Sequence, residues 1–189
     1  MTRCFWCNLK NPLYVKYHDE EWGYKCFSDE YLFEMLVLES FQAGLSWECV
    51  LNKREAFREA FDGFCVNAIS VYQSDKIDEL CKNALIIRNK RKIESTVTNA
   101  RIFNRIVSEY GSFISYLKCF WDGKTIYEND RVSSELSDAI SNDLYKRGMR
   151  FVGSVIIYSY LQAVGIIYSH EKGCFLYKGD TDEKRKMDK

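Results

Sequence analysis

Hydrophobic residues recur every three to four positions over most of this chain, which is the spacing of amphipathic helices. The clearest case is the segment from Asp29 to Gln42, where Ser28 and two acidic residues supply the start signal of a helix. This segment is apolar almost all round, so we expect it to be a buried central helix. No segment shows the alternation of a half-buried strand. The pattern therefore predicts an all-α fold.

Further helices are predicted from the same spacing and from their terminal residues. They cover residues 46–61, 74–84, 89–108, 112–121, 137–147 and 153–164. Ser46 and Ser137 are expected N-caps, and Gly148 and Gly165 are expected to end helices. The polar segment 124–133 is predicted to be a loop. We expect a single all-α domain over residues 1–178, followed by a charged, disordered tail at residues 179–189.

The composition fits a folded cytoplasmic protein. A chain of 189 residues with 47% hydrophobic residues is long and apolar enough to bury a core, which excludes a largely disordered protein. No apolar run approaches the roughly 20 residues of a membrane span, and the first six residues lack the apolar stretch of a signal peptide. In the cytosol we expect the eight cysteines to be thiols or metal ligands.

The net charge gives no general attraction to nucleic acid, because 27 basic residues balance 27 acidic ones. Any DNA binding must therefore depend on a local basic patch. Lys146, Arg147 and Arg150 form one such group, and the run from Arg88 to Lys92 forms another. Charge runs of this kind are more often solvated faces of helices, so alone they are weak evidence.

The only two histidines lie near opposite ends of the chain, and each has a cysteine nearby. Cys4 and His18 at the start, with His170 and Cys174 at the end, make up the ligand set of a tetrahedral structural zinc site. A competing interpretation is the C-x2-C pair of Cys4 and Cys7, which would be a redox pair or a different ligand pair. Spacing alone leaves both interpretations open.

Glu39 is the most unusual polar residue, because it falls on the apolar side of the predicted central helix. An ionised carboxylate there is costly unless hydrogen bonds or a cation compensate it. One interpretation is an internal cap or an ion pair, as with Arg54 or Arg58. The other is a pocket carboxylate that awaits a cationic ligand, since aromatic faces around a carboxylate suit a flat, positively charged heterocycle. Aromatic residues gather in the neighbouring segments, and each of them taken singly is more often a core residue than part of a binding site; they are Tyr14, Tyr17, Trp22 and Trp47.

Two predicted helices meet at a tight loop with a glycine at each end, Gly148 and Gly153. This pattern is typical of a helix–hairpin–helix, whose backbone N–H groups hold a DNA phosphate at a helix N-terminus. An ordinary hairpin of two helices has the same glycines, so the pattern is weak by itself.

Together, these segments resemble the family of 3-methyladenine DNA glycosylase I, a type I alkylation-repair glycosylase of the helix–hairpin–helix superfamily. The resemblance extends from Arg3 to Cys174, nearly the whole chain. It departs at Ser40-Phe41, where a more polar pair is expected before Gln42. The matching segments are YVKYHDEEWG (14–23), FEMLVLESFQAGLSW (33–47), VLNKR (50–54), IIRNKRKI (86–93), KRGMRFVG (146–153) and YSYLQAVG (158–165).

The resemblance implies a role for each candidate residue. It implies one structural zinc per chain, which joins the two ends of the chain and leaves Cys7 outside; its ligands are Cys4, His18, His170 and Cys174. It implies a pocket for the flipped base, with Glu39 as the catalytic residue, formed by Tyr17, Trp22, Glu39 and Trp47. It implies that Gly44 and Leu45 form an edge that enters the DNA. It also implies that the hairpin binds the DNA backbone, and the hairpin residues that we assign to this contact are Arg147, Gly148 and Gly153.

The activity implied is hydrolytic excision of N3-methylated adenine from alkylated double-stranded DNA by a monomeric enzyme. Residues 154–169 contain neither an acid nor a lysine. The resemblance accounts for this, because type I enzymes lack the aspartate of the wider superfamily, and a missing lysine argues against a Schiff-base lyase step. The alternatives are a non-catalytic helix–hairpin–helix module with a structural zinc, and a small zinc or thiol enzyme.

Overall fold

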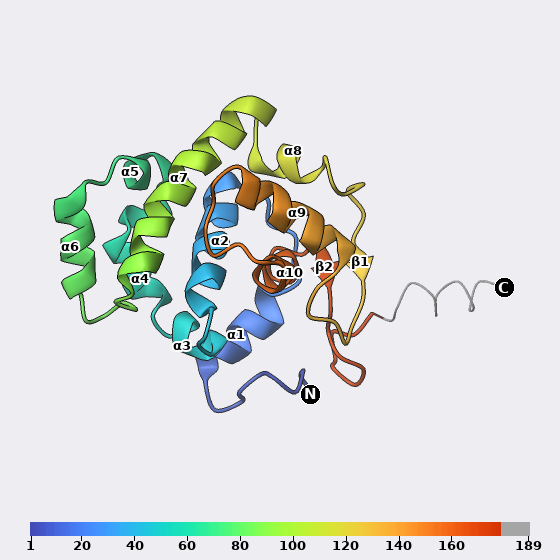
Figure 1. The fold of residues 1–189 in the computed structure, drawn as a ribbon. Helices are drawn as coiled ribbons and strands as arrows, with labels where there is room; N and C mark the ends of the chain where they lie inside the picture. Colours follow the sequence, from blue (N-terminus) through green and yellow to red (C-terminus); the bar gives the residue numbers. More distant parts are fainter. Residues whose placement is uncertain (179–189) are drawn as a thin grey trace.

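Helix α2 (Asp29–Gln42) lies at the centre of the molecule, and all of its residues from Leu32 to Phe41 are buried (Figure 1). In this computed structural model the Ser28 hydroxyl accepts a hydrogen bond from the Tyr31 amide, so the predicted start of the helix is confirmed. A helix buried on all sides has no polar face. A charged side chain on it must therefore find a partner inside the protein or face a cavity.

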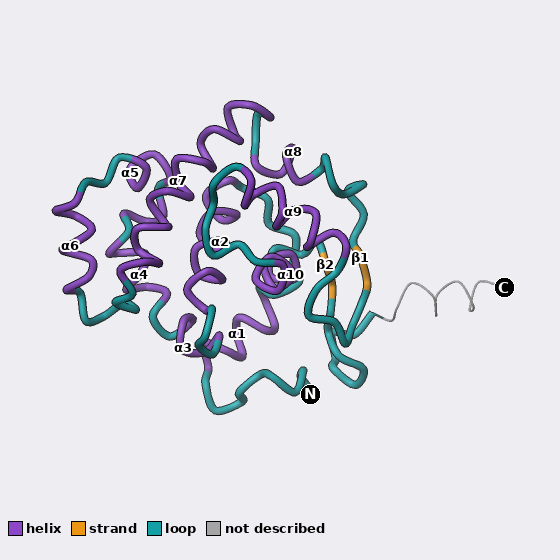
Figure 2. The backbone as a smooth tube through the Cα atoms, in the orientation of Figure 1, coloured by secondary structure: helices purple, strands orange, loops and turns teal. Residues whose placement is uncertain are grey.

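The structure describes residues 1–178, and the predicted charged tail at 179–189 lies outside them. The predicted all-α fold is confirmed, with two very short strands as the exception (Figure 2). The other elements of the described chain are α1 (Pro12–Glu20), α3 (Trp47–Leu51), α4 (Arg54–Ala60), a 3-10 turn (Asp62–Phe64), α5 (Val66–Ser70), α6 (Ser74–Lys82), α7 (Lys90–Tyr110), α8 (Phe113–Leu117), β1 (Ile126–Tyr127), α9 (Glu135–Lys146), α10 (Ser154–Ala163) and β2 (Ile167–Tyr168).

The long helix α7 separates two groups of elements, as Figure 1 shows. Helices α4, α5 and α6 gather at one end of the molecule, and α9, α10 and the strands lie at the other. Both α7 and α10 pack against α2, and a ring contact of 5.2 Å between Phe33 and Phe103 is one example of this packing. The core therefore centres on α2. None of the helices in residues 1–178 is long and apolar enough to cross a membrane.

The predicted helix at residues 46–61 is broken into α3 and α4. Its start is confirmed, because the Ser46 hydroxyl accepts a hydrogen bond from the Cys49 amide. The break follows Leu51, and beyond it the Arg54 guanidinium lies 2.7 Å from carboxylate oxygens of both Glu21 and Glu34. Hydrophobic spacing does not predict the break, because the apolar positions keep their helical interval across Asn52 and Lys53, where the backbone turns.

The predicted N-cap of α9 at Ser137 is wrong by one turn. Ser134 is the cap: its hydroxyl accepts from the Ser137 amide, and the Ser137 hydroxyl accepts from the Ser134 amide. In this reciprocal capping box both serines satisfy free amides, and only the first of them is the N-cap.

Helix α1 was not predicted, although its start signal is present. Asn11 caps the helix and Pro12 occupies its first position. The apolar spacing that follows is too weak to identify a helix. The omission matters because α1 carries Tyr17 and His18.

Strands β1 and β2 pair in parallel, with Ile126 opposite Ile167 and Tyr127 opposite Tyr168. Two residues are too few to show an alternating pattern, so these strands were not predicted. Their pairing fixes the chain just before His170.

Gly165 links α10 to β2 and crosses another segment at very short range. Its φ is +78°, and a Cβ placed on it would lie 2.5 Å from the carbonyl carbon of Tyr24 and 2.7 Å from the amide nitrogen of Lys25. We therefore expect Gly165→Ala to lower the free energy of unfolding by about 3 kcal/mol or more, from backbone strain plus a clash that flexible side chains cannot relieve.

Gly111→Ala is the matched control for this prediction. Its φ is +83°, but nothing lies within 4 Å of the added Cβ, so only the strain of about 1–2 kcal/mol applies. Urea denaturation of both variants measures the difference. Equal losses in the two variants would contradict the close approach at Gly165.

Candidate functional site

The Glu39 carboxylate is buried, and no cation within residues 1–178 forms a salt bridge with it. The residue is 4% exposed, and its Oε2 atom has no hydrogen-bond partner. The ion pair considered from the sequence does not form, because both Arg54 and Arg58 bind Glu34 instead, at 2.7 and 2.8 Å. Burial raises the pKa of Glu39 to about 8. Of the two interpretations of Glu39, the structure favours the pocket carboxylate.

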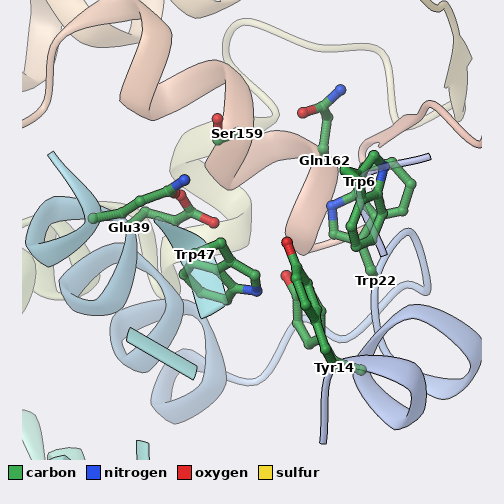
Figure 3. Close-up of a pocket in the computed structure, with 9 residues that line it drawn as sticks. Trp6, Tyr14, Trp22, Glu39, Trp47, Ser159 and Gln162 are labelled. Atoms are coloured by element: carbon green, nitrogen blue, oxygen red, sulfur yellow. The ribbon is translucent and has the colours of Figure 1, made fainter. Parts of the chain in front are cut away.

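Glu39 faces a cavity of about 210 Å³ with mainly aromatic walls. Figure 3 shows its carboxylate directed toward the Trp47 ring, with Tyr14, Trp6 and Trp22 across the cavity and two polar residues of α10 beside it. The cavity is lined by Trp6, Tyr14, Tyr17, Trp22, Glu39, Gln42, Trp47, Ser159 and Gln162. The structure thus brings together the four residues predicted to form the base pocket, Tyr17, Trp22, Glu39 and Trp47.

The aromatic walls form two groups of packed rings. Tyr17 and Trp47 have centroids 5.2 Å apart. Trp6 lies 5.4 Å from Tyr14 and 4.8 Å from Trp22. The indole Nε1 of Trp47 is buried without a partner. Burial raises the pKa of Tyr17 well above its usual value, so its hydroxyl stays protonated. The pocket therefore offers π faces, a free acceptor and a free donor, which suit a flat cationic ring.

A second cavity of about 220 Å³ shares Glu39, Gln42 and Ser159 with the first. Gly44 and Leu45, predicted to form the edge that enters DNA, line this cavity, and Leu45 is 42% exposed. The remaining lining residues are Ala43 of the same loop and Val155 and Ile156 at the start of α10. The predicted intruding edge therefore lies directly beside the pocket.

The predicted metal ligands come together, although they lie at opposite ends of the chain. The donor atoms of Cys4, His18, His170 and Cys174 all lie within 4.8 Å of one another, and all four residues are buried. The Sγ of Cys7 lies instead near the Tyr14 carbonyl oxygen, at 3.8 Å. The interpretation of Cys4 and Cys7 as a pair is therefore not supported. The four-residue cluster could hold a metal ion.

The surroundings of this cluster fit a cation. The Nδ1 of His18 lies 2.7 Å from the Asp19 carboxylate, which orients the ring so that Nε2 faces the cluster. The amides of Glu171 and Leu176 donate to the sulfurs of Cys4 and Cys174 at 3.4 and 3.5 Å. Without a cation, burial raises the pKa of Cys4 to about 12. A bound cation would allow both sulfurs to ionise.

The cluster supports one wall of the pocket. The ring of His170 lies 4.8 Å from that of Trp22, and the ring of His18 lies 5.1 Å from that of Trp6. Trp6 was missed from the sequence, although its position between Cys4 and Cys7 was a signal, because fixing Cys4 also fixes its neighbours. The polar residues Gln42, Ser159 and Gln162 were also missed, and no sequence pattern distinguishes them.

Residues 147–153 connect α9 to α10, which pack against each other. Gly148 has a φ of +103°, and the side chain of Asn99 on α7 holds the Arg150 amide and carbonyl, both at 2.9 Å. Helix α10 begins after Gly153 without a side-chain cap. Its first amides therefore have no partner within the helix.

The two arginines of this connection differ in their partners. Arg147 lies 2.7 Å from carboxylates of Asp143 and Glu109, so its charge is already compensated. The Arg150 guanidinium contacts backbone carbonyls and lies over the Tyr145 ring. No carboxylate in residues 1–178 forms a salt bridge with Arg150.

A model of the methyladenine glycosylase family matches residues 6–177. The chain belongs to this family. It is 38% identical over 186 residues to DNA-3-methyladenine glycosylase 1 of Escherichia coli strain K12, an alignment that covers 95% of this chain and 99% of the relative. The resemblance drawn from the sequence is confirmed.

Solved structures of methyladenine glycosylases share the fold. A crystal structure of 3-methyladenine DNA glycosylase I superposes with a TM-score of 0.89 at 38% identity, covering 93% of this chain and 100% of the other. A tyrosine-to-phenylalanine variant of such an enzyme, solved in complex with 3-methyladenine, gives a TM-score of 0.87 at 32% identity and covers 93% and 97%.

In this methyladenine glycosylase the buried Glu39 should make stability depend on pH. Its folded-state pKa of about 8 lies above the value of about 4.3 for an unfolded chain. Stability from this residue is complete below pH 4 and is lost as the pH rises toward 8, because the folded state then holds a proton that the unfolded state has released. We expect Glu39→Gln to melt higher than the wild type by an amount that grows from pH 5 to pH 8.

Thermal unfolding of both proteins across this range measures the effect, at about 2–4 °C per kcal/mol for a chain of this size. The control is Glu30→Gln, which makes the same change on an exposed side chain of the same helix and so removes no buried carboxylate. A constant difference between Glu39→Gln and the wild type would contradict the assignment.

Proposed function

We propose that this chain is a monofunctional DNA glycosylase that flips N3-methylated adenine out of alkylated double-stranded DNA and hydrolyses its glycosidic bond, acting as a monomer. The observation that carries the proposal is the unpartnered carboxylate oxygen of Glu39, which faces an aromatic cavity. The names of the relatives, and the 3-methyladenine bound to one of them, support the same substrate. A module that bound only the DNA backbone would need no such pocket.

The positive charge of the damaged base explains how such a pocket selects it. Methylation at N3 gives adenine a formal positive charge, which the faces of Trp47 and Tyr14 and the Glu39 carboxylate all attract. Neutral adenine gains no ion pair, and Glu39 facing it would remain a costly buried charge or a protonated acid. Extrusion from the helix costs a few kcal/mol. The attraction repays this cost for the cation alone.

Hydrolysis then needs little acid catalysis, because the methylated base is already a good leaving group. The bond from C1′ to N9 breaks, and its electron pair leaves with the base as neutral 3-methyladenine. Water attacks C1′ and loses a proton. Glu39 stabilises the positive charge on the sugar, and its raised pKa makes the carboxylate a stronger base for that proton. No lysine of residues 1–178 lines either cavity, which supports the absence of a Schiff-base lyase step.

We assign one structural zinc to Cys4, His18, His170 and Cys174. Two thiolates and two imidazoles are preferred ligands of tetrahedral zinc, and four protein ligands leave no position for a reactive water. A small zinc or thiol enzyme is therefore disfavoured. When bound, the ion supplies a fixed link between the two ends of the chain. The residues themselves hold the Trp6 and Trp22 wall of the pocket.

The DNA-facing surface includes the loop of Gly44 and Leu45 and the connection between α9 and α10. We propose that this connection is a helix–hairpin–helix, in which the amides from Gly148 to Gly153 hold a phosphate at the start of α10. To contact a phosphate, the Arg147 guanidinium would have to break its salt bridges with Asp143 and Glu109. We therefore give it the role of bracing the hairpin and assign the direct cationic contact to Arg150.

The decisive experiment is release of free base from methylated DNA, measured by chromatography. We expect the wild type to release 3-methyladenine and Glu39→Gln to lose about 100-fold or more of this rate, because a neutral amide neither attracts the cation nor stabilises the sugar charge. Glu30→Gln should keep full activity. A folded Glu39→Gln protein with normal release would contradict the role of Glu39, and an inactive wild type would contradict the function.

Zinc content provides an independent prediction. Elemental analysis should find one zinc per chain, and Cys174→Ser should lose the metal and lower the melting temperature, because binding energy contributes to folding. Cys7→Ser is the matched control, since Cys7 is equally buried but lies outside the cluster. If Cys7→Ser released zinc as readily as Cys174→Ser, the ligand set would be wrong.

A further inference from the structure

The loop after α2 is a type II turn that carries Leu45 at its end. Ala43 has φ −48° and ψ 110°, Gly44 has φ +82°, and the Leu45 amide donates to the Gln42 carbonyl. These values are those of the two central residues of a type II turn, which requires a positive φ at its third residue. Leu45 is thereby held at the exposed edge of the second cavity.

Nothing around Gly44 selects this form of the turn by packing. No atom lies within 4 Å of the position that a Cβ on Gly44 would occupy. Glycine adopts negative and positive φ about equally well, so the peptide between Ala43 and Gly44 can rotate toward the type I form. That rotation reverses the direction of the Ala43 carbonyl. A contact to this carbonyl therefore decides which turn is populated.

Lys92 makes this contact from the first turn of α7. Its ammonium group donates to the Ala43 carbonyl at 2.6 Å and to the Phe41 carbonyl at 2.8 Å. The residue is 5% exposed, and burial lowers the pKa of its side chain. Within residues 1–178 no carboxylate pairs with it. Instead, it supplies the cation that the end of α2 lacks among its own last residues.

The same ammonium group lies 5.8 Å from the ring centroid of Phe151 in the hairpin. Phe151 is also tied to α2 directly, because its carbonyl accepts a hydrogen bond from the Ser40 hydroxyl at 3.0 Å. Lys92 therefore lies where the turn beside the base pocket meets the hairpin.

We infer that Lys92 is a positioning residue that locks the 42–45 turn in the type II form and so presents Leu45 to the duplex during base extrusion. This inference rests on the proposed function. Lys92 does not line either cavity that includes Glu39. It acts through the turn, so its loss should slow extrusion of the base and leave recognition of an extruded base intact.

The test compares two substrates that differ only in the need for extrusion. A DNA strand whose single adenine is methylated at N3 is annealed to a complement with either thymine or an abasic position opposite the lesion. We expect Lys92→Met to slow single-turnover excision about tenfold or more opposite thymine, but less than about threefold opposite the abasic position, where no pair must open. Affinity for free 3-methyladenine, followed by tryptophan fluorescence, should stay within about twofold of the wild type.

Two variants control for other effects. Lys90→Met removes an exposed charge from the same end of α7 and should affect both substrates alike. Lys92→Gln keeps an N–H donor and should recover part of the paired-substrate rate. If Lys92→Met does not fold, Gly44→Ala disturbs the same turn through its φ alone and should show the same selective loss.

Equal losses on both substrates, or a matching loss of affinity for the free base, would overturn the positioning role, as would an unchanged rate on the paired substrate. Each of these results leaves the proposed function intact. The proposed function fails separately, if the wild type releases no base from either substrate.

Discussion

The structure depends on one costly feature, a carboxylate buried in the central helix that no cation of residues 1–178 compensates. Glu34 and Glu39 lie on the same helix and are both buried, yet their surroundings differ. Glu34 forms salt bridges with two arginines of α4, whereas the Oε2 atom of Glu39 has no hydrogen-bond partner in the described chain. Because the arginines are held by Glu34, Glu39 can attract only a cation that comes from outside. The pairing of the protein's own charges thus leaves Glu39 free to bind a cationic ligand.

Holding this pocket open requires rigid support on each side. The ion pairs of Arg54 join α2 and α4 to Glu21, the C-cap residue of α1. At the aromatic wall, the cluster of Cys4, His18, His170 and Cys174 brings both ends of the described chain together, and its histidine rings pack against Trp6 and Trp22. At the mouth, Lys92 fixes the turn that carries Leu45. These three supports come from different elements, and each uses polar or ionic groups whose geometry is more specific than apolar packing.

Much of this arrangement could be predicted from the sequence, but for different reasons in different places. The bounds of α2 followed from hydrophobic spacing and a serine cap, which act locally. The cluster that contains Cys4 and His170 joins residues far apart in the sequence. Its prediction rested on the residue types, which are those of zinc ligands, and not on a local pattern. No local pattern encodes the pairing of β1 with β2 or the packing of Trp6 on His18, because both are contacts between distant segments. Arg147 shows the same limit, because its basic neighbours in sequence gave no sign of the two carboxylates that meet it in space.

Among residues 1–178, Glu39 is the one acid that lines the cavity, which is consistent with the substrate proposed for it. An enzyme that removes a neutral base must activate its leaving group or supply a strong nucleophile. Here the cavity that Glu39 faces has this one carboxylate, no lysine and mostly aromatic walls. Such a site is a poor catalyst for cleaving the glycosidic bond of an unmodified nucleotide. Normal adenine is therefore not excised. The methyl group on the damaged base supplies the missing activation, so the lesion provides both the signal for recognition and the reactivity that its removal requires.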